Sequence, residues 1–214
     1  MDYCSDRVVM GTNQDYKNRA LASLEGNWGK TAIATLIFLI LSMGVSWTVT
    51  TPMGNNLVMS YSTQGIWTLL CLPLGWGFVV YFLNLIRNDN TDYERLFDGY
   101  MDFIRIFLAE FLVNLAMGIG MILLIIPGII IGSGLVMTGF ILKDDKEISA
   151  VDAMKKSWEM TDGYKGALVL LFLSFLGWII LSIFTLGIGM LFLYPYMQTA
   201  LAHCYEDLKA EKGM

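Results

Sequence analysis

Residues 103–142 read FIRIFLAEFLVNLAMGIGMILLIIPGIIIGSGLVMTGFIL, an apolar run of 40 residues with two charged side chains, Arg105 and Glu110. One transmembrane helix needs about 20 apolar residues to cross about 30 Å of hydrocarbon, so this run is long enough for two crossings. Pro127 and Gly128 lie in its interior, where proline removes a backbone donor and glycine permits a turn. The run therefore predicts a membrane hairpin made of residues 103–126 and 129–142.

The rest of the chain predicts two further hairpins of the same kind. Charged residues make up 15% of the sequence, below the roughly 25% of a soluble domain, and 56% of the residues are hydrophobic. We expect the crossings of the first and third hairpins at residues 31–50, 65–86, 166–184 and 190–203. The predicted fold class is therefore an all-α integral membrane protein, with six transmembrane helices arranged as three hairpins.

Prolines and glycines mark the bends expected in these crossings. Pro73 is expected to kink the second crossing, together with Gly75. Gly187 and Gly189 are expected to form the turn of the third hairpin, because glycine adopts backbone conformations that other residues avoid. Pro195 lies inside the sixth crossing, where it predicts either a simple kink or a backbone break beside a cavity.

A short amphipathic helix is expected before each hairpin, on the cytoplasmic face of the membrane. Each begins with a capping-box pattern, in which a hydroxyl and a carboxylate satisfy the first free amides of a helix. These patterns lie at residues 12–15, 91–94 and 149–152. Apolar residues then follow at spacings of three and four, which places them on one helical face, as in helices that lie on a membrane surface.

The amphipathic helix and its hairpin form a unit that occurs three times within a single membrane domain, residues 1–214. The units span residues 12–90, 91–147 and 148–208. The first and third units align without gaps at an offset of 137 residues, which pairs Gly26 with Gly163. Because each hairpin returns the chain to its starting side, this threefold pseudo-repeat predicts units related by an axis along the membrane normal.

The positions of lysine and arginine predict the orientation. Four of the fourteen fall in residues 1–30, three in 87–105, five in 143–165 and two in the tail, all on one side of the expected topology. Because cytoplasmic loops carry the excess of Lys and Arg, both termini should be cytoplasmic, in the cell membrane. The net charge of −5 gives no reason to expect a nucleic-acid partner.

Two residues of the central run form a candidate binding site with a nearby arginine. Glu110 is an acidic residue within a predicted span, and Asn114 lies four residues later on the same helical face. An ionisable group inside the membrane is a functional hypothesis by default, so Glu110 could relay a proton, bind a cation or coordinate a polar substrate. Alternatively, Glu110 reaches water at the cytoplasmic end of the span or pairs with Arg105.

Catalytic and metal chemistry are not expected. His203 is the only histidine, and no nucleophile elbow accompanies it, so an interfacial side chain is the simpler interpretation. The several His or Glu ligands at helical spacing that a metal hydrolase needs do not occur. Cys4, Cys71 and Cys204 lack a zinc or redox spacing and are expected to be free thiols. We therefore expect no cofactor, no metal and no enzymatic activity.

Two functions remain open for such a protein. The first is a transport or export component with a polar site between the hairpins. The second is a non-catalytic scaffold or lipid-sensing protein whose surface helices recruit a cytoplasmic or membrane partner. Membrane lipids are expected partners in both cases. Gly128 and Gly132 form a small-residue pattern that suits packing within the chain or an oligomer formed through glycine-rich faces.

Motifs along the whole chain resemble a known family. They comprise Gly75-Trp76, Ile126-Pro127-Gly128-Ile129, Ser157 to Met160, Gly163, Lys165, Ser174 to Trp178, Thr185 to Gly189, Pro195-Tyr196 and Tyr205-Glu206. This ordered set is similar to that of the bacterial multi-pass membrane family known as domain-of-unknown-function family 975. The resemblance implies a bacterial cytoplasmic membrane. It implies no catalytic residue or cofactor, because the family has no accepted activity.

Overall fold

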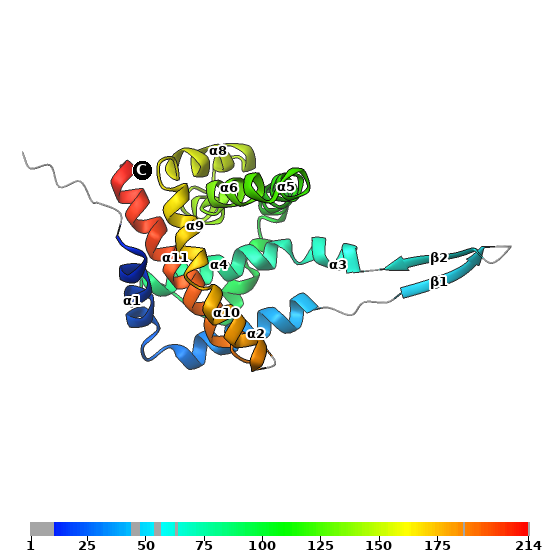
Figure 1. Cartoon of the computed structure of the whole chain (residues 1–214), viewed down its shortest axis with the longest axis horizontal. Coiled ribbons are helices and arrows are strands. Elements are labelled where there is room, and N and C mark those ends of the chain that lie inside the picture. Colours follow the sequence, from blue (N-terminus) through cyan, green and yellow to red (C-terminus); the bar gives the residue numbers. More distant parts are fainter. Residues whose placement is uncertain (1–10, 44–47, 54–56, 63, 186, 214) are drawn as a thin grey trace, which may run out of the picture.

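The computed structural model describes residues 11–43, 48–53, 57–62, 64–185 and 187–213. This part of the chain is helical apart from one antiparallel β-hairpin, so the predicted helical class is confirmed (Figure 1). Within it, Cys71 and Cys204 are free thiols, as expected, whereas Cys4 lies outside the described residues.

The first unit contains a β-hairpin that the sequence did not predict. Its elements are α1 (Asn13–Leu24), α2 (Trp28–Met43), β1 (Thr48–Met53), β2 (Leu57–Ser62), α3 (Gln64–Leu70) and α4 (Leu72–Ile86). The two strands pair with Thr48 opposite Ser62 and project from the helices in Figure 1. The prediction of a helical crossing up to residue 50, followed by a loop, is therefore wrong at residues 48–53 and 57–62. Residues 48–51 are all β-branched and favour a strand over a helix.

The second expected crossing is interrupted at Cys71, between the end of α3 and the start of α4. Pro73 follows in the first turn of α4. Proline is tolerated there because the amide that it lacks would have no helical partner. The kink expected at Pro73 and Gly75 stays a prediction, and Gly65–Ile86 qualifies as one apolar helical stretch.

The central run turns earlier than the sequence predicted. The second unit comprises the 3₁₀-helix η1 (Tyr93–Tyr100), α5 (Phe103–Leu123), α6 (Ile125–Leu135) and α7 (Thr138–Asp144). Leu124 is the extended residue between α5 and α6, with φ −164° and ψ 144°. Pro127 and Gly128 lie inside α6, so their prediction as the turn is wrong. A Cβ atom at Gly128 would lie 2.8 Å from the backbone nitrogen of Met121, so this glycine instead lets α5 and α6 approach closely.

The third unit ends in a long helix. It comprises α8 (Ala150–Met160), α9 (Lys165–Leu173), α10 (Leu176–Phe184) and α11 (Met190–Lys212). Gly187 has φ +85° in the turn before α11, as expected, while Leu186 lies outside the described residues. α11 continues through Pro195 and beyond His203, where the sixth crossing was expected to end. Tyr205 and Leu208 are buried, and this burial explains why the helix persists.

Two of the three expected capping patterns begin helices. Thr12 and Asp15 form the complete capping box at the start of α1, and the Thr12 hydroxyl holds the pKa of the Asp15 carboxyl below its usual value. The Ser149 hydroxyl accepts the Asp152 amide at the start of α8. No side-chain cap starts η1, so the capping box predicted at residues 91–94 is wrong.

Several helical stretches are apolar enough to cross a membrane. Among the described residues, four qualify by length and composition: Gly65–Ile86, Phe103–Ile122, Ile126–Asp144 and Lys165–Phe184. α1 and α2 would give a fifth if they form one span that is broken by the bend of 98° between them. α11 is not among these stretches, and its apolar first half is followed by a charged second half.

The returning helices of the hairpins form the interior of the molecule. Each of these stretches contains a most apolar window of 18 residues, and the buried share of that window differs between them. It is 61% in Gly65–Ile86 and 50% in Ile126–Asp144. It is only 17% in Phe103–Ile122 and 22% in Lys165–Phe184. The main core cluster includes side chains of α4, α7 and α11, among them Phe140 and Tyr205, whose rings stack at 5.0 Å. α5 and α10 therefore lie outside, with many apolar side chains exposed.

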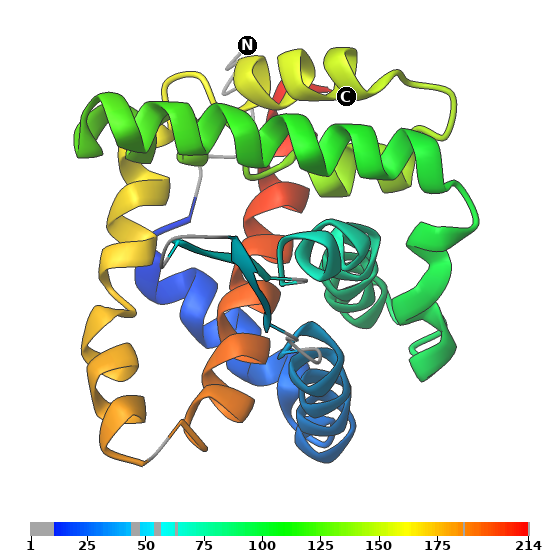
Figure 2. The ribbon, with the colours of Figure 1, turned by 90° about the vertical axis from the view of Figure 1, so that its right-hand side faces the viewer.

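The hairpins diverge instead of forming a parallel bundle. In Figure 2, α5 runs across the view, α9 to α11 run down it, and α2 and α4 are seen end-on. The exposed apolar helices therefore face different sides of the molecule.

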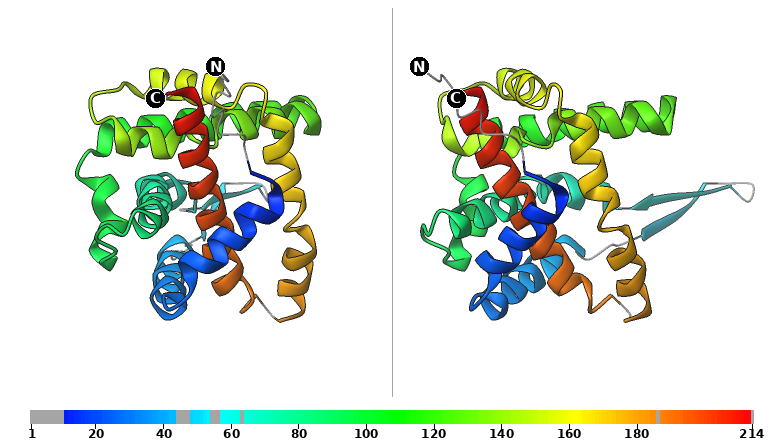
Figure 3. Two further views of the ribbon diagram at one scale, coloured as in Figure 1. Left: turned by 90° about the vertical axis from the view of Figure 1, so that its left-hand side faces the viewer. Right: turned by 60° about the vertical axis from the view of Figure 1, so that its left-hand side comes forward.

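Each short helix packs on the hairpin that precedes its own. η1 packs on α4, and α8 packs on α5, α6 and α7. α1, which has no preceding hairpin, packs on α11 of the last one and crosses it in Figure 3. The order of packing therefore closes into a ring that joins the first and last units.

Glycines make the contact between α4 and η1 possible. A Cβ atom at Gly77 would overlap the backbone carbonyl of Leu96, and one at Gly99 would overlap the backbone carbonyl of Pro73. Backbone atoms cannot move aside as a side chain can, so only glycine fits these positions without displacing η1.

We predict that Gly77→Ala destabilises the protein and that Gly75→Ala, in the same helix, does not. A Cβ atom at Gly75 would meet nothing within 4 Å. Overpacking at Gly77 should cost about 1–3 kcal/mol. Intrinsic tryptophan fluorescence of the detergent-purified proteins during heating measures the unfolding midpoint. Equal midpoints for the two variants would contradict the contact.

Candidate functional site

The residues predicted as a site lie on α5 but do not converge. The Glu110 carboxylate faces α7, with Oε1 3.8 Å from the position that a Cβ atom of Gly139 would occupy. Asn114 is exposed, and its amide donates to the backbone oxygen of Glu110 at 2.7 Å, within the same helix. Asn114 therefore contacts the backbone of Glu110 and not its carboxylate.

Arg105 fastens the segment that follows α7. Its Nε donates to Asp102 Oδ2 at 2.5 Å. Its Nη1 donates to the backbone oxygens of Asp145 and Ile148 at 3.1 and 3.3 Å, and its Nη2 to that of Leu142 at 3.3 Å. Among the described residues Asp102 is its acidic partner, so Arg105 is not the ion-pair partner of Glu110.

A polar cavity of about 340 Å³ lies between the first and second hairpins, and we call it the interhairpin cavity. Its wall combines charged side chains of η1, α5 and α7 with apolar ones. The residues that line it are Trp76, Arg95, Asp98, Met101, Asp102, Arg105, Ile106, Leu142, Lys143 and Lys146. Of the three residues predicted as a site, Arg105 is the one that lines this cavity.

Glu110 lies one helical turn deeper than the interhairpin cavity. Ile106, which lines the cavity, precedes Glu110 by four residues on α5 and so shares its face. The Trp76 indole nitrogen donates to the backbone oxygen of Gly139 at 2.9 Å and so fixes a tryptophan between the cavity and Glu110. No hydrogen bond or ion pair of the Glu110 carboxylate occurs within the described part of the chain.

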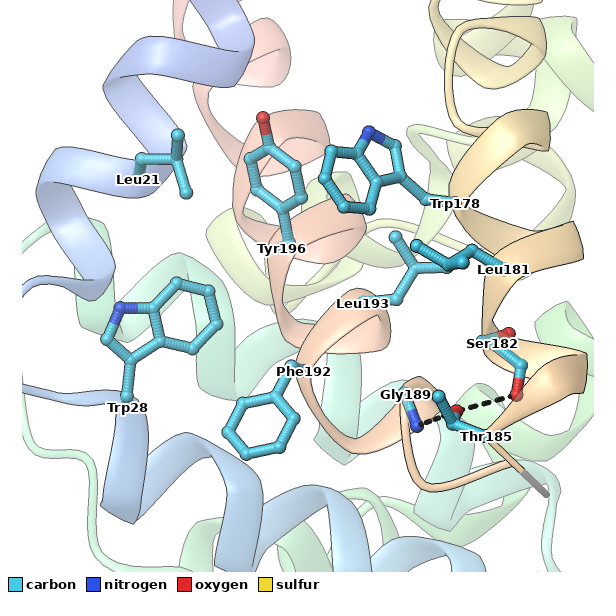
Figure 4. Close-up of a pocket in the computed structure, with 10 residues that line it drawn as sticks. All are labelled: Leu21, Trp28, Trp178, Leu181, Ser182, Thr185, Gly189, Phe192, Leu193 and Tyr196. Carbon is cyan, nitrogen blue, oxygen red and sulfur yellow. Dashed lines mark hydrogen bonds between the residues drawn. The ribbon is translucent and has the colours of Figure 1, made fainter.

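Other cavities are lined mainly by apolar side chains. One, of about 380 Å³, lies between α1, α10 and α11, with Trp28, Trp178 and Tyr196 around it (Figure 4). Its serine and threonine hydroxyl groups are bound to the backbone, since Ser182 donates to Ile179 at 2.7 Å and Thr185 to Ser182 at 2.8 Å. Such a wall suits a hydrocarbon chain and offers little to a polar ligand.

Sequence reasoning missed a charged junction between the returning helices. Arg87, at the end of α4, donates twice to Asp144 of α7, at 2.6 and 2.8 Å. Its Nε donates to Glu206 of α11 at 2.6 Å. Tyr205 and Lys209 of α11 also bond Asp144. The bonded partners lie 57 to 119 positions apart, so no local motif signals the junction.

His203 belongs to the contact between α1 and α11. Its Nδ1 contacts Arg19 Nη2 at 3.3 Å, and its Nε2 contacts Ser23 Oγ at 2.8 Å. A guanidinium can only donate, so Nδ1 accepts and Nε2 carries the proton. In this tautomer His203 cannot take a proton from Ser23, and Asp207 bonds Arg19 instead of the imidazole. The pair is therefore not arranged as a nucleophile and its base.

The described residues contain no group of three or more His, Cys, Asp and Glu side chains that could hold a metal ion. The interhairpin cavity is therefore the candidate site, with charged groups from elements that are far apart in sequence.

We predict that Asp144→Asn weakens the protein at the junction. The carboxylate accepts from three side chains and is largely buried, so its loss should cost about 1.5–3 kcal/mol. Asp152→Asn is the control, because its ion pair with Lys155 is exposed to solvent and should contribute little to stability. Thermal unfolding in detergent compares the two. If the junction does not stabilise the fold, both variants will have the unfolding midpoint of the wild type.

Comparison with known proteins agrees with the resemblance seen in the sequence. The family described as "Protein of unknown function (DUF975)" matches residues 10–131 and 118–212. No curated protein and no solved structure matches the chain. The matched ranges cover nearly the whole sequence and include the interhairpin cavity and the charged junction. The chain therefore belongs to the DUF975 family.

Proposed function

We propose that this chain is a six-span protein of the bacterial cytoplasmic membrane and acts as a transport or export component. In this proposal its polar ligand occupies the interhairpin cavity. The proposal assigns the protein no catalytic step. The observation that carries it is the polar, charged wall of this cavity, in a molecule whose outer helices are apolar.

The exposed apolar side chains support insertion in a membrane. α5, α10 and α2 expose large hydrophobic side chains on different sides of the molecule, where water would be a poor solvent. They include Ile33, Ile40, Met43, Ile104, Leu108, Leu115, Ile119, Ile122, Trp178, Ile180, Ile183 and Phe184. We assign the remaining crossings to α2 and to the apolar first half of α11.

The ring of helix packing supports the threefold pseudo-repeat. Each short helix packs on the preceding hairpin, as copies around an axis would. Gly26 and Gly163, which pair at the offset of 137 residues, both have positive φ, at +78° and +86°. The junction of Arg87, Asp144 and Glu206 would then lie on the axis, where the returning helices end.

The orientation can be tested by cysteine labelling. We predict that Ile188→Cys, in the turn of the third hairpin, reacts with a membrane-impermeant maleimide on intact spheroplasts, while Lys155→Cys on α8 does not. Both side chains are exposed, and the native cysteines are first replaced. Permeabilised cells, in which both sites should react, provide the control. Labelling of Lys155→Cys in intact cells would contradict cytoplasmic termini.

Glu110 is the residue that we assign to the transport step. It lies one turn deeper in the membrane than the cavity, behind Trp76, without a partner among the described residues. A carboxylate in this position suits coupling to a proton or contact with a substrate that moves beyond the cavity.

We predict that the gently purified protein retains a stoichiometric polar or amphiphilic molecule, and that Glu110→Gln lowers its retention. Asn114→Ala should not, because that side chain faces outward from the same helix. Native mass spectrometry reads small molecules, lipids and proteins together. Full retention by the Glu110→Gln variant would remove this residue from the site.

The scaffold is the second candidate, and the exposed face of α8 favours it. Val151 and Trp158 are exposed beside a groove of about 490 Å³ that α5 and α8 share. A partner protein could pack there. In the same mass spectrometry experiment, a stoichiometric protein without any small ligand would favour the scaffold over transport.

A further inference from the structure

We infer that the interhairpin cavity binds a phosphate-type anion. This inference rests on the proposed function, because it names the ligand class of the same site. It is carried by the charges of the wall: four cationic and two acidic side chains face one cavity of about 340 Å³.

The acidic side chains of the cavity are already paired. Arg95 Nη1 bonds Asp98 at 3.3 Å, and Arg105 Nε bonds Asp102 at 2.5 Å. Arg105 uses its other donors on three backbone oxygens. Within each of these two pairs the positive and the negative charge cancel. The excess positive charge of the wall therefore comes from the lysines.

Lys143 and Lys146 supply that excess. Lys143 is half-buried near the end of α7, and Lys146 follows three residues later. Neither has an ion pair or a side-chain hydrogen bond to the part of the chain that the structure describes. Lys143 and the exposed Lys146 therefore line the cavity without an ion-pair partner among the described residues.

The other neighbouring carboxylates do not line the cavity. Asp144 bonds Arg87, Tyr205 and Lys209. Asp145 Oδ1 accepts the backbone amides of residues 147 and 148, each at 3.1 Å. Glu110 lies behind Trp76, one turn deeper, and Glu147 is exposed and does not line the cavity.

A phosphate group matches this wall in charge and in chemistry. Lysine binds phosphate as a compact point charge, and two lysines supply charge for a phosphate monoester with two negative charges or for a phosphodiester with one. Trp76, Ile106 and Leu142 provide apolar surface, which excludes water and strengthens the attraction. The volume is at the lower end of ligand pockets, so it fits a head group or a small phosphate ester.

The ligand could come from the membrane or from the cytoplasm. Met101 and Ile104 are exposed and apolar beside the cavity, so an acyl chain attached to the phosphate could lie along α5. Basic pockets between membrane helices bind phospholipid head groups in this way. A soluble phosphate ester would use the same two lysines without the chain.

The experiment measures both sources on the full chain in neutral detergent. Native mass spectrometry titrates dioleoyl phosphatidylglycerol against dioleoyl phosphatidylcholine, and calorimetry titrates glycerol 3-phosphate. The double variant Lys143→Gln/Lys146→Gln should weaken the binding of the anion about 30-fold. Lys155→Gln/Lys156→Gln removes the same charge from the surface of α8 and should bind as the wild type does. Thermal unfolding verifies that both variants are folded.

Each outcome decides the inference. Lysine-dependent preference for phosphatidylglycerol assigns the site to a lipid head group, and lysine-dependent binding of glycerol 3-phosphate assigns it to a soluble ester. The inference is overturned if neither probe binds, or if both double variants bind equally well. An uncharged molecule that co-purifies with the protein would then leave the proposed function standing. Conversely, anion binding could depend on the lysines while the Glu110→Gln variant retains its ligand fully. The anion site would then stand, and the proposed transport role of Glu110 would be excluded.

Discussion

Arg87 holds the returning helices together through its bonds to Asp144 and Glu206. A guanidinium stays charged at any physiological pH, so its partial burial is tolerated only where carboxylates surround it. The hydrogen bonds from Arg87 to Asp144 raise the pKa of the guanidinium further. Pairing these charges brings the ends of α4 and α7 against the charged second half of α11. The buried rings of Tyr81, Phe140 and Tyr205 lie on these helices or just beside the junction.

Small residues control how the outer elements fit around this interior. In a membrane, helices gain little by hiding apolar side chains from lipid, so close packing becomes important. Gly77 admits η1, Gly128 admits α5, and Gly134 admits the Trp158 ring of α8. The same α8 contact is fixed by the Ser157 hydroxyl, which donates to the Gly134 carbonyl at 2.8 Å. Glycines that resemble an oligomer motif in the sequence thus serve contacts within the chain.

The charged residues near α5 divide into two kinds. Arg105 has its donors engaged by a carboxylate and by backbone oxygens, so it is a structural clamp that also lines a cavity. Lys143 and Lys146 face the same cavity without such partners among the described residues. A binding site and a structural support can therefore share one wall, and only the contacts separate the two roles.

The sequence by itself determined the helical class, the apolar stretches and the starts of α1 and α8, because these depend on residues a few positions apart. It also pointed to Glu110, since a carboxylate within an apolar run stands out by composition. The sequence placed the central turn at Pro127-Gly128 instead of Leu124, and it missed the β-hairpin. In both places the local preference of a residue type, proline or the β-branched residues, competes with the length of the apolar run that predicts a crossing. The tertiary structure alone decided the Arg87 junction, the ring of packing and the interhairpin cavity. Their partners lie tens of residues apart, and no local pattern records which of them meet when the chain folds.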